Sequence, residues 1–212
     1  MVANRNCVIR LSRYKNALGR LKSLGFVKVF SDNLADAVGV TSTQVRKDFS
    51  IFGVTGNKKG GYQIDSLTEK LNNILGKNEV QKAIIVGVGK IGAALMDYRG
   101  FEKEGIKIVA GFDVDPSKIN RDREIKVLPL EELGDFVREN NIKIGIVAVP
   151  DMAAQHVLDN MISAGIKGIL NFAPIRLRGD EGIVINNVNL EIELENLIYY
   201  VNMQEKAVQG AE

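Results

Sequence analysis

The feature that most constrains this chain is a glycine-rich turn placed directly after a short apolar strand. Residues 83–86 read Ala-Ile-Ile-Val, as expected of a strand buried on both faces. A helix pattern with Leu95 and Met96 on one face follows the turn, which gives the strand–turn–helix order of a βαβ unit. The six residues of the turn are Gly87, Val88, Gly89, Lys90, Ile91 and Gly92.

Each glycine in this turn has its own physical reason. Gly87 permits the sharp turn, Gly89 lets the backbone approach a pyrophosphate, and Gly92 lets the helix pack against the strand. The helix N-terminus adds amide donors and a positive dipole. We therefore predict that the turn binds the pyrophosphate of a dinucleotide. The alternative is a glycine-rich turn without a ligand.

An acidic residue ends the next predicted strand. Residues 106–112 are mostly apolar and lead into Asp113, which lies 21 residues beyond Gly92, where an acceptor for a ribose 2′-hydroxyl is expected. Val114 follows rather than an arginine, which favours NAD(H) over NADP(H). We assign Asp113 to the ribose of the bound dinucleotide.

Strands and helices continue to alternate after this unit. Further strands are predicted at 125–128, 142–149, 166–172 and 183–188, with helices at 130–139 and 153–164. This alternation predicts an α/β fold with a doubly wound, Rossmann-like parallel sheet, whose ligand crevice lies at the carboxyl ends of the strands. Two segments at those ends either line the nicotinamide pocket or simply end their strands, and they comprise Val149, Pro150, Asn171, Phe172, Ala173 and Pro174.

Charge is divided unevenly along the 212 residues. Residues 1–75 hold 12 Lys and Arg against 5 Asp and Glu, whereas residues 76–212 hold 16 against 21. The basic segment indicates either a nucleic-acid partner or a plain solvated face. No apolar run approaches the ~18 residues of a membrane span, Cys7 is the only cysteine, and no signal-peptide pattern begins the chain. We expect a cytoplasmic protein without a membrane partner or a metal.

The basic segment has the pattern of a winged-helix domain. An amphipathic helix over residues 8–24 precedes two short helices, 31–38 and 41–52, joined by a glycine-containing turn, and four glycines within residues 53–62 surround a basic loop. Such a helix either reads the major groove with its outward face or is merely an exposed helix. The predicted DNA contacts are Arg10, Gln44, Arg46, Lys47, Ser50, Lys58, Lys59 and Tyr62.

The C-terminal tail departs from the alternating pattern. Residues 190–203 predict a long helix with an apolar face and two tyrosines. That face packs either on the sheet of its own chain or, as we expect, on a second copy across a dimer interface. The predicted domains are therefore 1–78 for the winged helix, 79–188 for the Rossmann unit and 189–212 for a dimerisation helix.

Taken in order, these motifs resemble the Rex family of redox-sensing repressors. The matching stretches cover residues 44–48, 52–53, 61–62, 87–92, 98–101, 112–116 and 164–174. The resemblance implies a homodimeric bacterial transcription factor whose winged helices bind a palindromic operator while NAD(H) binds the Rossmann domain. It also implies release from DNA at a high NADH/NAD+ ratio, a C-terminal helix swapped between subunits, and a cofactor-linked role for Tyr98.

Two positions depart from that family pattern. Asn16 stands where many members have an arginine, and Asn189 stands where they have an aspartate after a valine. In the family these charges form, with the tyrosine matching Tyr98, a switch whose pairing differs between the DNA-bound and NADH-bound states. Because both charges are absent here, we expect neutral contacts around Tyr98 and the swapped helix to couple the cofactor to DNA.

Two other functions are compatible with a Rossmann domain. One is a small NAD-dependent oxidoreductase with an accessory N-terminal domain, and the other is a regulatory module that binds a different nucleotide or CoA. Hydride transfer needs a positioned acid or base beside the substrate, yet the only histidine, His156, is predicted inside a helix and away from the crevice. We therefore predict a regulator with no catalytic residues.

Overall fold

The computed structural model describes residues 4–57 and 60–209, with side chains described as far as Lys206 at the C-terminal end. The chain divides into two compact units, Met1–Glu79 and Val80–Glu212. Lys58 and Lys59 of the predicted wing lie outside the described residues.

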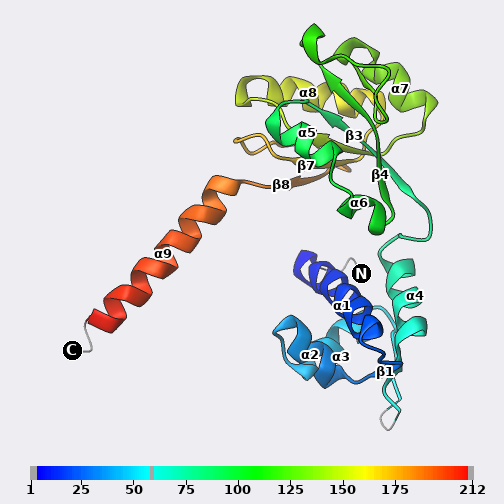
Figure 1. The fold of residues 1–212 in the computed structure, drawn as a ribbon, viewed down its shortest axis with the longest axis vertical. Coiled ribbons are helices and arrows are strands. Elements are labelled where there is room, and N and C mark those ends of the chain that lie inside the picture. Colours follow the sequence, from blue (N-terminus) through cyan, green and yellow to red (C-terminus); the bar gives the residue numbers. More distant parts are fainter. Residues whose placement is uncertain (1–3, 58–59, 210–212) are drawn as a thin grey trace. The chain divides into compact units, whose positions relative to one another are not determined.

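The first unit packs helices against a short antiparallel strand pair (Figure 1). Its elements are α1 (Arg5–Ser23), β1 (Lys28–Val29), α2 (Ser31–Val38), α3 (Ser42–Ile51), β2 (Tyr62–Gln63) and α4 (Ile64–Ile74). A single apolar core joins α1, α3 and α4, and its fully buried members include Leu11, Leu18, Phe49 and Leu71. The predicted helix order is confirmed.

The turn between α2 and α3 follows from local chemistry. Gly39 has φ 75°, a left-handed conformation that glycine adopts without strain, and its amide donates to the Ala35 carbonyl at 2.9 Å. The Thr41 hydroxyl then accepts a hydrogen bond from the Gln44 amide at 3.1 Å and so caps α3. These contacts produce the predicted helix-turn-helix.

A short hairpin closed by the bridge between Asn57 and Gly61 follows α3, as the glycine-rich segment predicts, and its second arm continues into β2, which pairs with β1 from before α2. β1 pairs antiparallel with β2, with Val29 opposite Tyr62. Nearer the tip, the Gly61 amide donates to the Asn57 carbonyl at 2.9 Å, and the Asn57 amide donates back to Gly61 at 3.2 Å. Gly61 has φ 62°, and a β-carbon there would lie 2.5 Å from the Val29 carbonyl oxygen. The hairpin therefore depends on glycine at this position.

The second unit contains a six-stranded parallel sheet in the order β5-β4-β3-β6-β7-β8. The strands are β3 (Gln81–Val86), β4 (Ile106–Asp113), β5 (Val127–Pro129), β6 (Ile144–Val147), β7 (Gly168–Asn171) and β8 (Val184–Asn187). Counted along the chain, this is the 3-2-1-4-5-6 order of a dinucleotide-binding doubly wound sheet. The predicted strands all form, but most are shorter, and Ile125 and Lys126 lie outside β5.

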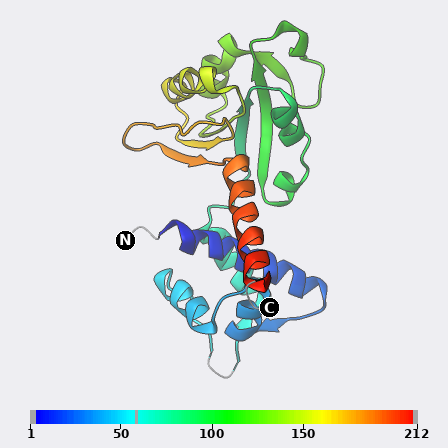
Figure 2. The same ribbon diagram turned by 90° about the vertical axis from the view of Figure 1, so that its left-hand side faces the viewer.

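Helices cover both faces of the sheet. They are α5 (Lys90–Met96), α6 (Gly100–Lys103), α7 (Leu133–Glu139) and α8 (Asp151–Ala164), with single 3-10 turns at Pro116–Lys118 and Leu130–Glu132. Successive residues of β3 face opposite layers because side chains alternate along a strand. Ile84 and Val86 pack with α7 and α8, whereas Ala83 and Ile85 pack with α5. Figure 2 shows α8 (yellow) and α5 (green) on opposite sides of the strands.

The last helix, α9 (Leu190–Gln209), follows β8. The Asn189 side chain caps it, because Oδ1 accepts the amides of Glu191 and Ile192 at 2.9 and 3.1 Å. Every described side chain from Leu190 to Lys206 is exposed, including nine large apolar or aromatic groups such as Leu194, whose exposed fraction is 58%. Docking of this helix on its own sheet, the alternative left open above, does not occur in the described part of the chain. None of the described helices combines the length and apolar character needed to cross a membrane.

Candidate functional site

A cavity of about 660 Å³ opens at the carboxyl ends of β3, β4, β6 and β7. It lies where the strand order reverses between β3 and β6, the position at which open α/β sheets bind their ligands. Most of the predicted cofactor residues line it, namely Gly87, Gly89, Lys90, Ile91, Asp113, Val149, Pro150, Phe172 and Pro174. The strand-end segments therefore form the cavity wall and do more than terminate their strands.

The three glycines of the turn face different surroundings. Gly87 has φ 93°, and a β-carbon there would lie 2.5 Å from the Ala148 carbonyl oxygen, so the turn tolerates only glycine. A β-carbon on Gly92 would collide with the Gly87 carbonyl, which places Gly92 in the helix–strand contact. At Gly89 a β-carbon would meet nothing within 4 Å. Gly89 therefore borders open space at the cavity rather than protein.

Asp113 is held at the end of β4 by several donors. Its carboxylate accepts the Val88 amide at 2.7 Å and the Asp115 amide at 3.0 Å, and Lys118 Nζ lies 3.2 Å away. Burial alone would raise the pKa of Asp113, but these donors outweigh it and hold the pKa below its usual range. A carboxylate has about four acceptor sites, so the anion keeps capacity for a ligand hydroxyl.

Four predicted cofactor residues support the cavity from behind. Val88 and Gly92 are buried, as is Ala173. Asn171 is fully buried, and its amide nitrogen donates to the Ile175 carbonyl at 2.8 Å and to Asn187 Oδ1 at 2.9 Å. Its oxygen accepts the Ala173 amide at 2.9 Å. The side chain of Asn171 therefore fixes the loop after β7, and a contact of Asn171 with the cofactor stays a prediction.

Tyr98 does not line this cavity. Its side chain is 58% exposed and packs edge-to-face on Phe101, with ring centroids 5.1 Å apart. It borders a separate hollow of about 360 Å³ together with Arg99 and Arg123. The predicted role of Tyr98 toward the cofactor therefore stays a prediction.

The placement of His156 was predicted only in part. It lies within α8 and is exposed, as expected, but it also lines the 660 Å³ cavity, contrary to the expectation that it would lie away from the crevice. Its Nε2 lies 3.2 Å from the Asn160 amide nitrogen, one helical turn further along. Among the residues that the structure describes, no three His, Cys, Asp or Glu side chains gather in a way that could hold a metal ion.

The first unit presents a second candidate site on α3. Arg46, Lys47 and Ser50 are exposed, as predicted. Arg46 and Tyr62 line one hollow of about 340 Å³, so α3 and the hairpin form a continuous surface. Tyr62 is half-buried and packs edge-to-face on Phe49, with centroids 5.3 Å apart.

Two predicted DNA contacts turn inward instead. Gln44 is half-buried, and its amide nitrogen donates to Asp48 at 2.7 Å. Arg10 donates to the same carboxylate through Nε at 2.6 Å and through Nη2 at 2.7 Å. Gln44, expected to point outward, is therefore tied at its side-chain nitrogen to a buried carboxylate, and the DNA contacts of Gln44 and Arg10 stay predictions.

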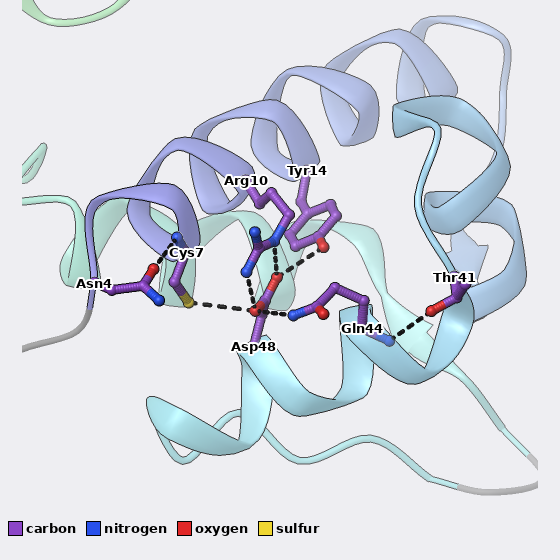
Figure 3. Close-up of polar contacts among 7 residues, drawn as sticks. All are labelled: Asn4, Cys7, Arg10, Tyr14, Thr41, Gln44 and Asp48. Atoms are coloured by element: carbon purple, nitrogen blue, oxygen red, sulfur yellow. Dashed lines mark hydrogen bonds and ion pairs between the residues drawn. The ribbon is translucent and has the colours of Figure 1, made fainter.

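Asp48 is the functional candidate that the sequence did not reveal. Its carboxylate is fully buried between α1 and α3 and also accepts the Tyr14 hydroxyl at 2.9 Å and the Cys7 thiol at 3.4 Å (Figure 3). Burial raises the pKa of the Cys7 thiol. Burial would also raise the pKa of Asp48, but the donors around it, Arg10 first, hold that pKa at about 2.

Together, a helix-turn-helix unit with a hairpin and a dinucleotide-type Rossmann unit define a class of ligand-responsive DNA-binding regulators. Two family models agree with this division: "Putative DNA-binding protein N-terminus" matches residues 5–50, and "CoA binding domain" matches residues 78–175. The chain is 42% identical, over 94% of its length and 95% of the relative's, to the redox-sensing transcriptional repressor Rex of Desulforamulus reducens. The chain belongs to the Rex family of redox-sensing transcriptional repressors.

Solved structures agree over the whole chain. The crystal structure of RSP in complex with β-NAD+ and operator DNA superposes with a TM-score of 0.91 at 33% identity, covering 99% of this chain and 98% of that one. The crystal structure of RSP in complex with β-NADH gives a TM-score of 0.87 at 33% identity and covers 99% of both chains. The predicted family and α/β fold are confirmed.

Proposed function

We propose that this chain is a transcriptional repressor that binds operator DNA through α3 and the hairpin and releases it when NADH fills the Rossmann cavity. The single observation that carries this is the 660 Å³ cavity at the switch point of the sheet, bordered by Gly89 and Asp113, in a chain that also has a helix-turn-helix. RSP, which has the same fold, has been crystallised with NAD+ and operator DNA and with NADH. We infer a cytoplasmic location, because the proposed ligands, operator DNA and NAD(H), are found in that compartment.

The residues around the cavity fit a dinucleotide. Open space at Gly89 allows a pyrophosphate to approach the backbone, and the Lys90 side chain lines the cavity beside it with a positive charge. Asp113 would accept the ribose hydroxyls, and the apolar wall at Val149 and Phe172 would receive the nicotinamide ring. Bound NAD(H) would supply the redox state that the protein senses, and hydride transfer is not part of this proposal.

We infer that the functional form is a homodimer whose α9 helices are exchanged. Support comes from the exposed apolar side chains of α9, because a row of such groups in water is costly and a second copy would bury them. A dimer presents two copies of α3, which would bind a palindromic operator. Sedimentation equilibrium of the full chain, compared with the variant Leu194→Glu/Leu197→Glu, tests this inference. A monomeric wild-type protein would contradict it.

Gel shifts of the full-length protein on operator DNA, titrated separately with NAD+, NADH and CoA, test the proposed function. We expect NADH to release the DNA at concentrations at which NAD+ leaves it bound. Release by CoA alone would favour the other regulatory ligand, which one family model describes. Consumption of NADH in the presence of candidate carbonyl compounds would instead indicate an oxidoreductase.

A further inference from the structure

A buried carboxylate joins the recognition helix to the rest of the first unit. Asp48 lies on the inward side of α3 and accepts hydrogen bonds from three side chains of α1, which are Cys7, Arg10 and Tyr14 (Figure 3). The side chain of Asp48 is 1% exposed and that of Arg10 is 21% exposed. The cluster is therefore largely shielded from water, and hydrogen bonds from three side chains of α1 hold the Asp48 carboxylate in place.

Stability alone does not explain such a cluster. Removing a carboxylate and a guanidinium from water is costly, and apolar side chains of similar volume often stabilise a core equally well. What the ion pair adds is direction, because the Arg10 fork binds the carboxylate through two parallel donors. This fixes the orientation of Asp48 relative to α1.

The orientation of Asp48 is passed on to Gln44. Gln44 is the third residue of α3, and the first turn of a recognition helix is the part that reaches base edges. Its backbone amide donates to the Thr41 hydroxyl at 3.1 Å, and its side-chain nitrogen donates to Asp48 at 2.7 Å. Figure 3 shows that the amide nitrogen of Gln44, not its oxygen, faces Asp48.

This contact leaves a defined set of groups on Gln44. One N–H is used by Asp48, and the oxygen and the second N–H remain. An amide oxygen beside an N–H is the pattern that pairs with N6 and N7 of adenine in the major groove. A glutamine that was free to rotate its amide would present either edge and would discriminate less well.

We propose that Asp48 is a specificity-determining positioning residue, which orients Gln44 so that Gln44 reads one A·T pair in each operator half-site. This inference rests on the proposed DNA-binding function. Arg10, predicted from the sequence as a DNA contact, acts here through Asp48. Asp48 itself touches no base.

The test uses the full-length protein. The wild-type protein first selects its preferred duplexes from a pool of DNA duplexes whose central sequence is randomised. Each base pair of the selected half-site is then replaced in turn, and the Kd is measured by fluorescence anisotropy. Three variants are compared with the wild type: Arg10→Met/Asp48→Leu, which removes both charges together, Gln44→Met, and Arg46→Met as a matched control on the same helix. Arg10→Lys keeps a cation beside Asp48 and tests rescue.

We expect the wild type to lose about 5- to 150-fold in affinity when one A·T pair is replaced, the range for a bidentate base contact. Gln44→Met and Arg10→Met/Asp48→Leu should both lose the preference at that pair and keep it elsewhere. Arg46→Met should lose its preference at a different pair, and Arg10→Lys should retain most of the preference at the first. Retention of the A·T preference by Arg10→Met/Asp48→Leu would overturn the proposal.

Other outcomes separate this inference from the proposed function. If the wild type selects no duplex, the DNA-binding function fails and this inference fails with it. If Arg10→Met/Asp48→Leu lowers the affinity for every duplex by the same factor, Asp48 only supports the fold and the proposal is wrong. If that variant does not fold, NMR of the wild type tests the proposal instead. The Gln44 side-chain N–H bound to Asp48 should exchange slowly with solvent. Exchange as fast as that of a free glutamine would overturn the proposal.

Discussion

The carboxylate of Asp113 accepts a hydrogen bond from the backbone amide of Val88 at 2.7 Å, so the end of β4 is tied to the glycine-rich turn after β3. The pairing joins two residues 25 positions apart. The Asp113 carboxylate thus orders the turn that would hold a pyrophosphate, and it also lines the cavity where the ribose would bind. Phosphate and ribose recognition are therefore expected to be coupled in this protein.

Replacement of Gly89 should remove cofactor binding without unfolding the protein. In Gly89→Val the new side chain enters open space at the cavity, where it would block a pyrophosphate, and the backbone at φ −78° accepts an L residue. Titration by NADH fluorescence should show no binding, with an unchanged Tm. Gly92→Ala is the control, because its β-carbon collides with the Gly87 carbonyl and should lower the Tm. Undiminished NADH affinity in Gly89→Val would place the effector site elsewhere.

Replacement of Asp113 should weaken NADH binding while leaving the turn partly ordered. Asp113→Asn keeps one oxygen as an acceptor for the Val88 amide but loses the charge, and a hydrogen bond to a neutral acceptor is weaker than one to a charged acceptor by about 1–1.5 kcal/mol. Isothermal titration calorimetry with NADH measures the loss of binding free energy in Asp113→Asn. Asp115→Asn, which changes an exposed neighbouring acid, serves as the matched control, and equal losses in both variants would argue against a specific role for Asp113.

The first unit should lose stability in acid because of Asp48. Its pKa of about 2 in the folded protein lies below the unfolded value, so the anion stabilises the fold above about pH 4 and this contribution disappears as the pH falls toward 2. A shift of this size corresponds to roughly 2 kcal/mol. Hydrogen exchange of the α3 amides at several pH values should show the loss, and Arg10→Met/Asp48→Leu should flatten it. A wild-type profile without any change between pH 4 and 2 would contradict this.

Arg46 and the wing lysines should affect DNA binding differently. Arg46→Ala should cost about 1–3 kcal/mol and relax the preference at one operator position, because arginine reads base edges. Lys58→Ala should weaken binding to all sequences evenly and reduce the salt dependence, because lysine contacts phosphate. Anisotropy titrations at several salt concentrations distinguish the two. Unchanged binding in both variants would remove the support for a winged-helix DNA interface.

Asn189 offers a test of how cofactor and DNA are coupled. Asn189→Asp should keep the cap of α9, since both residues accept backbone amides well, so that its effect reports charge alone. Together with Asn16→Arg it restores the charges that the family resemblance implies, and the double variant should change the ratio of operator affinities with NADH and NAD+. Either single change should impair the protein, because it adds one unpaired charge. Additive effects in the double-mutant cycle would show that the two positions are not coupled.

Much of the fold and of the cofactor cavity could be predicted from short-range patterns. The turn from Gly87 to Gly92 and the acid at Asp113 are each specified within one βαβ unit, where alternation along the chain already places them at the carboxyl ends of strands. The helix-turn-helix was equally accessible, because Gly39 and Thr41 act on backbone groups three or four residues away. Such contacts need no knowledge of distant segments.

What only the tertiary structure decided are the contacts between segments far apart in sequence. From the sequence alone, Asp48 is an ordinary charged residue of a basic helix. It is a buried anion only because α1 packs against α3 and places Arg10, 38 positions away, in contact with it. The same packing turns Arg10 and Gln44 inward, and the order of the sheet brings His156 to the cavity while leaving Tyr98 outside it. Burial and partner choice depend on which helix faces cover one another, and local periodicity does not encode that arrangement.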